Sequence, residues 1–408
     1  MRVIVLNDYG YVNGGAAQVA VSSLNDLAQS GLDVTFIFGV GPVDPRVDSN
    51  LVRVVDFGLH DLLGNQSRIR AAVSGIWERR TEKRLREVLS DFRPGETVLH
   101  LHSWVQSLSS SAVRTAIDMG FPVVCTLHDY FSVCPNGGLY NFSQQRSCEL
   151  RPMTAACITC NCDSRNYAHK LWRVGRHAVQ ERLGRIPEGI TSFISVSAYS
   201  ESIIRPLLSP AAKFYRVCNP IDIVKEPPAT VVEQNAFTFI GRLSPEKGAS
   251  SFAAAAQLAG VRARFIGSGG EQSRIAQIHP AAEFTGWLER PAVVRAIRSS
   301  RSIVFPSLWH EPQGMVVWEA AALGVPAIVA DSCAAGEAIV DGETGLLFKS
   351  GDVSDLVSRL TLLDRNPSLA AQLGRKAYDH YWAAPSTQAS HTKQLITVYS
   401  DILNLPRS

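Results

Sequence analysis

HEPQGMVVWE, residues 310–319, is the stretch from which the fold of this chain is read most directly. It holds two carboxylates eight residues apart, on either side of a glycine. A small-residue helix signal follows, ends at Gly324-Val325-Pro326 and leads into the apolar run Ala327–Ala330. This pattern predicts a loop that carries Glu311, a helix that begins near Gly314, and a buried strand.

Such a helix start suits an oxygen-rich ligand. Its first backbone N–H groups have no intrahelical acceptor, so they favour an anion near Glu311. Further along the same helix, Glu319 can accept hydrogen bonds from ligand hydroxyls. The plain alternative is that each glutamate only caps the helix or balances its dipole, which is the more frequent role. The rest of the chain must decide between these readings.

Length and composition favour a two-domain globular protein. The chain has 408 residues, of which 46% are hydrophobic and 19% charged. No apolar run approaches the roughly 20 residues that span a bilayer, and the apolar start Met1–Leu6 is too short for a signal peptide. A net charge of +3 gives no indication of a nucleic-acid partner. We therefore expect a cytoplasmic protein.

Apolar runs alternate with helical segments along most of the chain. The first series of predicted strands is Arg2–Leu6, Val34–Phe38, Thr97–Leu101, Val123–Leu127 and Phe193–Val196. The second series is Phe237–Ile240, Ala263–Ile266, Ser302–Phe305 and Ala327–Ala330. Helix-favouring segments include Ala16–Gln29, Thr81–Asp91 and Ser110–Asp118. The alternation predicts an α/β protein with two doubly wound parallel sheets, separated at the proline-rich segment Asn219–Pro228.

Two turns are candidates for anion binding. The first strand is followed by Asn13-Gly14-Gly15 and a helix, where glycines let backbone N–H groups approach a ligand; a plain tight turn is the alternative. The second series opens with GRLSPEKG, in which Arg242 and Lys247 lie between a strand and a helix. Two cations this close suit a diphosphate whose charge grows as a bond breaks, and a solvated turn is the alternative.

With these motifs, the chain resembles the retaining nucleotide-sugar glycosyltransferases of family four, the glycosyl transferases group 1. The matching motifs are VNGGAAQVA, HDYFSVCPN, GRLSPEKG, EPQGMVVWEAAALGVP and GEAIVDGETGLLF. They reach to about Asp352 and cover nearly the whole chain. The resemblance implies the GT-B fold, in which two Rossmann-like domains face each other across a cleft. The first would comprise 1–218, with a cysteine-rich insertion at 134–162 and a return helix at 385–408, and the second 219–384.

The resemblance also implies roles for residues of the second domain. Arg242 and Lys247 would hold the donor diphosphate. Glu311 would bind hydroxyls of the donor sugar, helped by the backbone N–H groups of Gly314 and Met315. Because such enzymes retain the anomeric configuration by front-face attack, the leaving phosphate takes the acceptor proton and no protein nucleophile is needed.

Further roles are implied on both sides of the cleft. Glu319 would hold the ribose, and Gly14 and Gly15 would bring backbone toward the phosphates. His128, at the end of the fourth predicted strand, would lie beside the donor sugar and stabilise the charge that develops there. No cofactor or metal would be required for catalysis.

The expected partners are a UDP- or GDP-type sugar donor and a glycan or lipid-linked acceptor, in polysaccharide or cell-envelope glycan biosynthesis. Gln313 and Gln18 depart from the family pattern and leave the donor open. A sugar-nucleotide epimerase or a phosphorylase of the same fold is one alternative. A non-catalytic nucleotide-sugar-binding protein is another.

Five of the eight cysteines lie in the insertion, at Cys134, Cys148, Cys157, Cys160 and Cys162. In a cytoplasmic protein such a cluster favours metal over disulfides, and four thiolates could form a tetrahedral structural zinc site. We favour all but Cys160 as ligands, because proteins that resemble this one tend to lack it. Reduced buried thiols are the main alternative, and an iron–sulfur cluster a lesser one.

Two helices complete the prediction. The basic segment 167–185 is expected to pack its apolar side and to solvate its charges, with contact to the inner face of a membrane or to a lipid diphosphate as the alternative. The apolar residues of segment 387–403 recur at helical spacing. In proteins that resemble this one, the last helix crosses back to the first domain.

Overall fold

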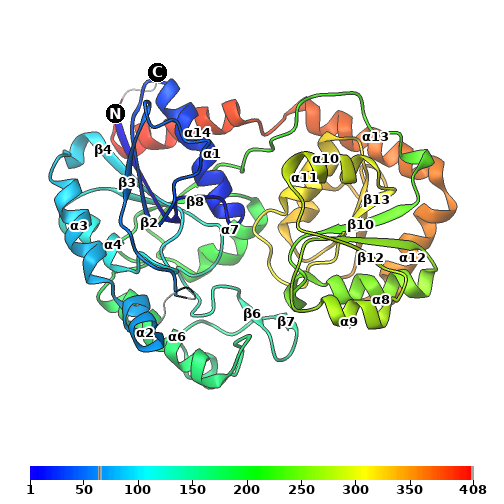
Figure 1. Cartoon of the computed structure of the whole chain (residues 1–408), viewed down its shortest axis with the longest axis horizontal. Helices are drawn as coiled ribbons and strands as arrows, with labels where there is room; N and C mark the ends of the chain where they lie inside the picture. Colours follow the sequence, from blue (N-terminus) through cyan, green and yellow to red (C-terminus); the bar gives the residue numbers. More distant parts are fainter. Residues whose placement is uncertain (63, 65–66, 406–408) are drawn as a thin grey trace. The chain divides into compact units, whose positions relative to one another are not determined.

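The computed structural model describes residues 1–62, 64 and 67–405 (Figure 1). It divides the chain into two compact units. The first comprises 1–138, 149–220 and 386–408, and the second 139–148 and 221–385. Each unit has its own parallel sheet with helices packed around it. The predicted α/β class with two doubly wound sheets is confirmed.

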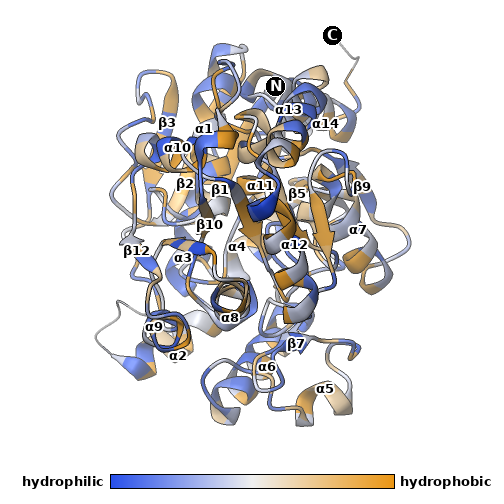
Figure 2. Ribbon diagram, turned by 90° about the vertical axis from the view of Figure 1, so that its right-hand side faces the viewer, coloured by the Kyte–Doolittle hydropathy of each residue, from blue (hydrophilic) through white to orange (hydrophobic). Residues whose placement is uncertain are grey.

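The sheet of the first unit has the strand order β3-β2-β1-β4-β5-β8-β9, and all its pairs are parallel. The strands are β1 (Arg2–Tyr9), β2 (Asp33–Val40), β3 (Val52–Asp56), β4 (Thr97–Leu101), β5 (Val123–Thr126), β8 (Ser192–Ser195) and β9 (Lys213–Arg216). The five predicted strands all form, because their apolar runs are buried on both faces. The strands near the middle of Figure 2 are accordingly coloured as hydrophobic.

The sheet of the second unit has the order β12-β11-β10-β13-β14-β15 and is also parallel. Its strands are β10 (Ala236–Ile240), β11 (Arg262–Ile266), β12 (Glu283–Gly286), β13 (Ser302–Phe305), β14 (Ala327–Ala330) and β15 (Leu346–Phe348). The four predicted strands form its centre. The edge strands were not predicted.

The helices of the first unit are α1 (Gly15–Gln29), α2 (Arg68–Ile76), α3 (Arg79–Leu89), α4 (Ser111–Asp118), α5 (Ala155–Thr159), α6 (Tyr167–Arg182), α7 (Ala198–Ile204) and α14 (Gln388–Ile402). Those of the second are α8 (Ala249–Ala259), α9 (Gln272–Ile278), α10 (Arg290–Arg298), α11 (Met315–Ala322), α12 (Val353–Arg365) and α13 (Pro367–Ala383). Short 3-10 turns are η1 (Pro94–Glu96), η2 (Arg205–Leu207), η3 (Val231–Glu233), η4 (Pro245–Lys247) and η5 (Ala334–Ala338). Within the described residues, no helix is long and apolar enough to cross a membrane.

The last helix, α14, belongs to the first unit, as predicted. Leu395, Val398 and Tyr399 are buried in the same apolar cluster as residues of β1, β2 and α1. The helix therefore ties the end of the chain to the sheet that begins it (Figure 1).

The cysteine-rich insertion is divided between the two units, which differs from its expected place in the first domain. Its hairpin, β6 (Tyr140–Asn141) and β7 (Arg146–Ser147), packs with the second unit. There the Ser147 hydroxyl donates to the carbonyl oxygen of Leu308 at 3.1 Å. This contact follows from the tertiary fold and has no counterpart in the sequence pattern.

Helix α6 is oriented differently from the prediction. Lys170 and Arg176 are buried, whereas Leu171 is 45% and Leu183 54% exposed. The expectation that the helix solvates its charges and buries its apolar side is therefore wrong for these residues. Arg176 can be buried because it donates to the Val105 carbonyl at 3.2 Å and lies against aromatic rings.

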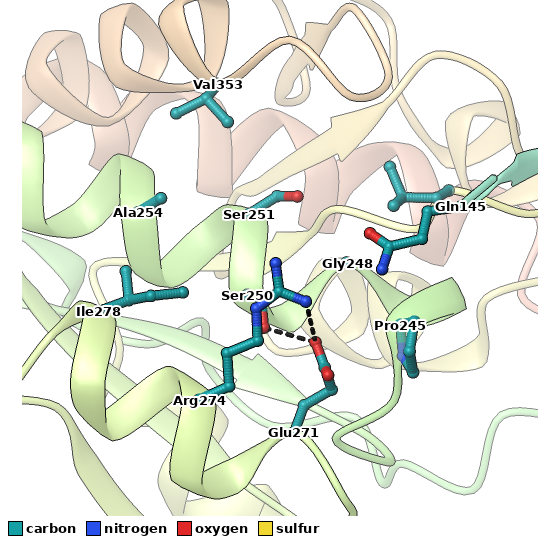
Figure 3. Close-up of a pocket in the computed structure, with 11 residues that line it drawn as sticks. Gln145, Pro245, Gly248, Ser250, Ser251, Ala254, Glu271, Arg274, Ile278 and Val353 are labelled. Carbon is teal, nitrogen blue, oxygen red and sulfur yellow. Dashed lines mark hydrogen bonds and ion pairs between the residues drawn. The ribbon is translucent and has the colours of Figure 1, made fainter. Parts of the chain in front are cut away.

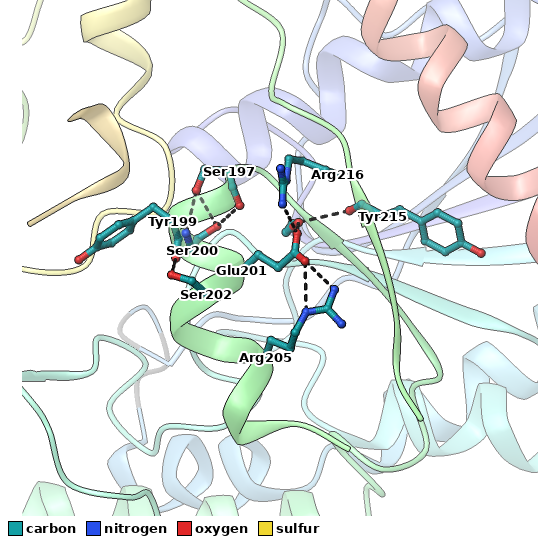
Figure 4. A network of polar contacts seen from close by, with 9 residues as sticks. Ser197, Tyr199, Ser200, Glu201, Ser202, Arg205, Tyr215 and Arg216 are labelled. Carbon is teal, nitrogen blue, oxygen red and sulfur yellow. Dashed lines mark hydrogen bonds and ion pairs between the residues drawn. The ribbon is translucent and has the colours of Figure 1, made fainter. Parts of the chain in front are cut away.

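A polar network ties α7 to the sheet of the first unit (Figure 4). The Glu201 carboxylate accepts from the Ser195 hydroxyl at 2.8 Å and pairs with Arg205 at 2.5 Å and Arg216 at 3.1 Å. Burial raises the pKa of Glu201, but these donors outweigh it and the net direction is down. With both carboxylate oxygens paired, the network is structural.

Candidate active site

Two neighbouring strands of the second sheet bring a lysine and a glutamate together. β10 and β13 are parallel neighbours, so their carboxyl ends lie at one edge of the sheet. Lys247 follows β10, Glu311 follows β13, and the Lys247 Nζ donates to Glu311 Oε2 at 2.5 Å. The Trp309 indole N–H donates to the same oxygen at 2.7 Å, and the Lys247 Nζ lies 5.0 Å from the centre of the Trp309 ring. These three residues form one charged cluster.

Two glycines let the loops of this cluster pass close to the sheet. Gly248 has φ +69°, and an added Cβ would lie 1.9 Å from the carbonyl oxygen of Pro306. Gly314 has φ +73°, and its added Cβ would lie 2.5 Å from the Cβ of Ala335. Both positions therefore require glycine. As predicted, the helix begins just after Gly314, at Met315.

Arg242 has a different partner from Lys247. Its Nη2 lies 3.1 Å from Glu246 Oε1, and its side chain is 69% exposed. Glu246 is buried and also accepts from the Ser244 hydroxyl at 2.7 Å. The guanidinium is thus an accessible cation on the same loop as Lys247.

Glu319 lies inside α11 and pairs with Arg290, which no sequence motif singles out. Glu319 Oε1 is 2.6 Å from Arg290 Nη1, and Arg290 Nη2 donates to the Asp222 carbonyl at 2.9 Å. Burial raises the pKa of Glu319, and Arg290 acts against that shift. Arg290 stands at the start of α10, outside every motif, and only the fold brings it to Glu319.

The glycine turn lies in the first unit, at the start of α1. Gly14 has an extended backbone (φ 171°), and an added Cβ at Gly14 or Gly15 would meet nothing within 4 Å. Neither a left-handed conformation nor a close neighbour among the described residues requires glycine here. The packing therefore gives no support to the alternative in which the two glycines serve only to form a tight turn.

His128 follows β5 of the first unit and is paired with another histidine. His102, which follows the neighbouring strand β4, places its Nδ1 2.9 Å from His128 Nε2, and the two rings are stacked 5.1 Å apart. Burial lowers the pKa of His128 to about 3 and holds that of His102 well below its usual value. Both rings are neutral at physiological pH. His102 lies outside every motif of the sequence, and only the alternation His100-x-His102 at the end of β4 would have singled it out.

Asp129, the next residue, is also perturbed. Burial raises its pKa to about 6, against the hydrogen bond that its carboxylate accepts from the Phe131 N–H at 2.9 Å. The carboxylate of Asp8 acts in the same direction as burial. Asp8 itself accepts three backbone N–H groups of the loop after β4, at 2.8–3.0 Å.

Three of the predicted zinc ligands surround a buried lysine. The Lys170 Nζ lies 3.5 Å from Cys157 Sγ and is also hydrogen-bonded to Cys162. The amide of Asn136 accepts from Cys134 Sγ at 3.1 Å and donates to Cys162 Sγ at 3.4 Å. Burial alone would lower the pKa of Lys170, but the surrounding sulfurs raise it.

The fourth predicted ligand, Cys148, lies in the hairpin that packs with the second unit, where its N–H donates to the Leu139 carbonyl. Among the described residues, no group of three or more His, Cys, Asp or Glu side chains is arranged to hold a metal ion. The zinc site stays a prediction.

A separate pocket of about 210 Å³ lies beside α8 in the second unit (Figure 3). Gln145 of the insertion hairpin lines it, together with residues of η4, α8 and α9. Glu271 accepts from the Ser250 hydroxyl at 2.6 Å and lies 3.7 Å from Arg274. None of the predicted donor-site residues lines this pocket.

Comparison with known families matches both halves of the chain. The model of Glycosyltransferase Family 4 covers residues 13–225, and that of Glycosyl transferases group 1 covers residues 221–380. Together they span the first turn, the paired histidines and the Lys247–Glu311 cluster.

Individual curated relatives match the chain over half of its length or less. A glycogen synthase of Mycobacterium tuberculosis is 29% identical over 216 residues, 49% of this chain and 51% of that protein. A GDP-mannose-dependent alpha-mannosyltransferase of the same species is 33% identical over 144 residues, 34% of this chain and 38% of that protein. The chain thus spans about half the length, or less, of these curated relatives.

Solved structures share the fold over almost the whole chain. A sucrose-phosphate synthase from Thermosynechococcus elongatus superposes with a TM-score of 0.71 at 16% identity, covering 99% of each chain. Anabaena Alr3699/HepE in complex with UDP superposes with a TM-score of 0.65 at 16% identity, covering 98% of this chain and all of that one. With a family model matched over more than half its length, the chain belongs to Glycosyltransferase Family 4 and has the GT-B fold, its second half being a group 1 glycosyl transferase domain.

Proposed function

We propose that the chain is a retaining glycosyltransferase that moves a sugar from a nucleotide-diphosphate donor to a glycan or lipid-linked acceptor. The observation that carries the proposal is the contact between Lys247 and Glu311 at the carboxyl edge of the second sheet. This edge is where open α/β sheets bind ligands. Family membership supports the reaction class.

The cations would serve the leaving diphosphate. Lys247 and Arg242 lie on one loop, and both can pair with phosphate oxygens as the sugar–phosphate bond breaks. A diphosphate at Lys247 competes with Glu311 for the ammonium, which leaves that carboxylate to accept hydroxyl hydrogens of the sugar. The N–H groups of Gly314 and Met315 would add donors at the start of α11.

Other residues would hold the rest of the donor. Glu319, oriented by Arg290, would accept the ribose hydroxyls. His128 would lie beside the sugar, and Gly14 and Gly15 would bring backbone to the phosphates. The scheme uses no metal and no protein nucleophile, since the departing phosphate takes the acceptor proton on the face where the acceptor attacks.

The donor is proposed to be of UDP or GDP type. A similar fold has been solved with UDP-glucose, and a related sequence is a GDP-mannose-dependent enzyme. The proposed setting is polysaccharide or cell-envelope glycan assembly. An epimerase, a phosphorylase or a non-catalytic nucleotide-sugar binder remains the competing assignment.

Product analysis separates these assignments. The enzyme is incubated with UDP-, GDP- and ADP-sugars, with and without a glycan or lipid-linked acceptor mixture. Nucleoside diphosphate released faster with acceptor, and a product with the donor's anomeric configuration by NMR, support the proposal. Conversion of the donor alone to another nucleotide sugar would show an epimerase, and an inverted product would refute retention.

We further propose a cytoplasmic protein that contacts the inner face of the membrane through α2 and α6. Ile69 and Val73 of α2 are 80% and 63% exposed, beside Arg68 and Arg70, and Leu171 of α6 is also exposed. Exposed apolar groups among arginines suit an anionic bilayer. Absence of co-sedimentation with anionic vesicles at low salt would refute the contact.

A further inference from the structure

The contact between His102 and His128 in the first unit points to a role for His102 that the proposed function does not include. His102 and His128 come from the ends of β4 and β5, which are parallel neighbours. Their hydrogen bond, Nδ1 of one to Nε2 of the other, is 2.9 Å long. One of these two nitrogens must donate and the other accept. Because both rings are neutral, the bond fixes complementary tautomers on the two rings.

The bond also determines which face of His128 a ligand can use. With Nε2 occupied by His102, Nδ1 is the remaining ring nitrogen, and in the described residues no protein group is hydrogen-bonded to it. His128 is only partly buried, whereas His102 is 3% exposed. The buried ring therefore lies behind the accessible one.

His102 is itself held from behind. Its ring lies 4.2 Å from that of His100. His100 is fully engaged, with Nδ1 2.6 Å from the Tyr399 hydroxyl of α14 and Nε2 2.6 Å from the Thr126 hydroxyl of β5. The other histidines that lower the pKa of this pair are His100 and, on α14, His391. The stack leaves His102 little freedom to turn away from His128.

We propose that His102 is a positioning residue: it fixes the ring orientation and tautomer of His128, so that His128 presents Nδ1 alone to the donor sugar. The inference rests on the proposed role of His128 in glycosyl transfer. A neutral histidine can both donate and accept, and a ring free to flip or tilt would present the wrong nitrogen or hold Nδ1 out of line with the sugar. Fixing the ring avoids this misalignment before the transition state is reached.

Two substitutions at His102 test this with the full-length enzyme. Asparagine places an amide atom close to the position of the imidazole Nδ1, whereas leucine has similar bulk and no polar atom. His102→Leu is expected to lower kcat roughly 10- to 100-fold with little change in KM, because only transition-state positioning is lost. His102→Asn is expected to recover most of that loss. Equal kcat in both variants would overturn the proposal.

Tyr215→Phe is the matched control. It removes the hydrogen bond from the Tyr215 hydroxyl to Asp401 of α14, and it leaves the three histidines and their contacts in place. It is expected to lower the unfolding temperature while kcat stays near that of the wild type. If His102→Leu changed kcat no more than Tyr215→Phe at comparable stability, the role of His102 would be structural and the proposal wrong.

A spectroscopic measurement keeps the inference separate from the proposed function. Nitrogen-15 NMR of histidine-labelled protein should show one fixed tautomer for His128, and a mixture of tautomers in His102→Leu. If His128→Ala left kcat unchanged, the catalytic role of His128 would fail, while the NMR result would still decide on the bond. A tautomer mixture in the wild type would overturn the inference whatever the activity.

Discussion

Lys247 and Glu311 form an ion pair of 2.5 Å across the ends of β10 and β13, and Trp309 donates to the same carboxylate. The lysine and glutamate side chains are only 19% and 15% exposed. In a partly buried site, charges interact more strongly than in water. An anionic ligand that binds Lys247 must therefore replace the contact between Lys247 and Glu311 with one of similar strength. The pair keeps both groups oriented toward one position.

Loss of Lys247 should therefore affect turnover far more than folding. Lys247→Ala is expected to lower kcat by roughly 100- to 1000-fold, the typical effect of one preorganised contact to a developing charge. Lys376→Ala is the control, because Lys376 faces Glu343 at 4.0 Å with 46% of its side chain exposed. Steady-state rates at saturating donor, together with the unfolding temperature of both variants, check this. Wild-type turnover in Lys247→Ala would refute the assignment.

Substitution of glycine by alanine should affect donor affinity at some positions and stability at others. Gly14 and Gly15 have open space where a Cβ would be, so Gly14→Ala and Gly15→Ala should fold normally but bind a nucleotide sugar more weakly. In Gly374→Ala the new Cβ would lie 2.3 Å from the Gly324 carbonyl oxygen, so it should lose stability but not donor affinity. Calorimetric titration and thermal unfolding separate the two effects. Unchanged donor affinity in both turn variants would argue that the turn is only structural.

The buried carboxyl of Asp129 predicts a pH-dependent stability. Its pKa rises from 3.8 to about 6 on folding, so the folded state holds a proton that the unfolded state releases. Its contribution to stability is therefore lost as pH rises from about 4 through 6, and the penalty is complete above pH 6. Asp129→Asn removes it and should stabilise the protein by roughly 1–3 kcal/mol at pH 8, but hardly at pH 4. An equal gain at both pH values would contradict the shift.

The cysteine cluster predicts bound metal, with Lys170 offsetting part of the thiolate charge. Protein purified without chelator should contain about one zinc per chain, as four thiolates form one tetrahedral site. Cys162→Ser should lose it, and Cys125→Ser, at a buried cysteine outside the cluster, should not. Elemental analysis decides: less than a few tenths of a zinc per chain in the wild type would remove the hypothesis.

The sheet centres could be predicted because buried parallel strands are continuous apolar runs. Edge strands such as β3 and β9 could not, since their half-exposed residues alternate without such a run. The orientation of α6 was missed for a related reason. Lys170 and Arg176 are buried against sulfurs, a carbonyl and aromatic rings, and helical periodicity contains no information about such partners.

In the candidate site, too, some residues could be predicted from local sequence and others depend on tertiary contacts. Lys247 and Glu311 could be predicted because both lie in motifs that follow central strands. Arg290 and His102 could not, because their contacts with Glu319 and His128 are made between elements far apart in sequence. Local pattern therefore selected the charged groups of the candidate site but not the residues that contact them.

The central claim, a nucleotide-sugar site built on Lys247 and Glu311, is tested most directly by ligand-dependent unfolding. Wild-type protein is heated with UDP-, GDP- and ADP-sugars at one common concentration, and a donor present at 100 times its Kd adds about 2.7 kcal/mol to the stability. One class should raise the unfolding temperature by roughly 2–4 °C. Lys247→Ala should lose that shift at the same ligand concentration, and Lys376→Ala should keep it. No shift with any donor, or an equal shift in Lys247→Ala, would contradict the account.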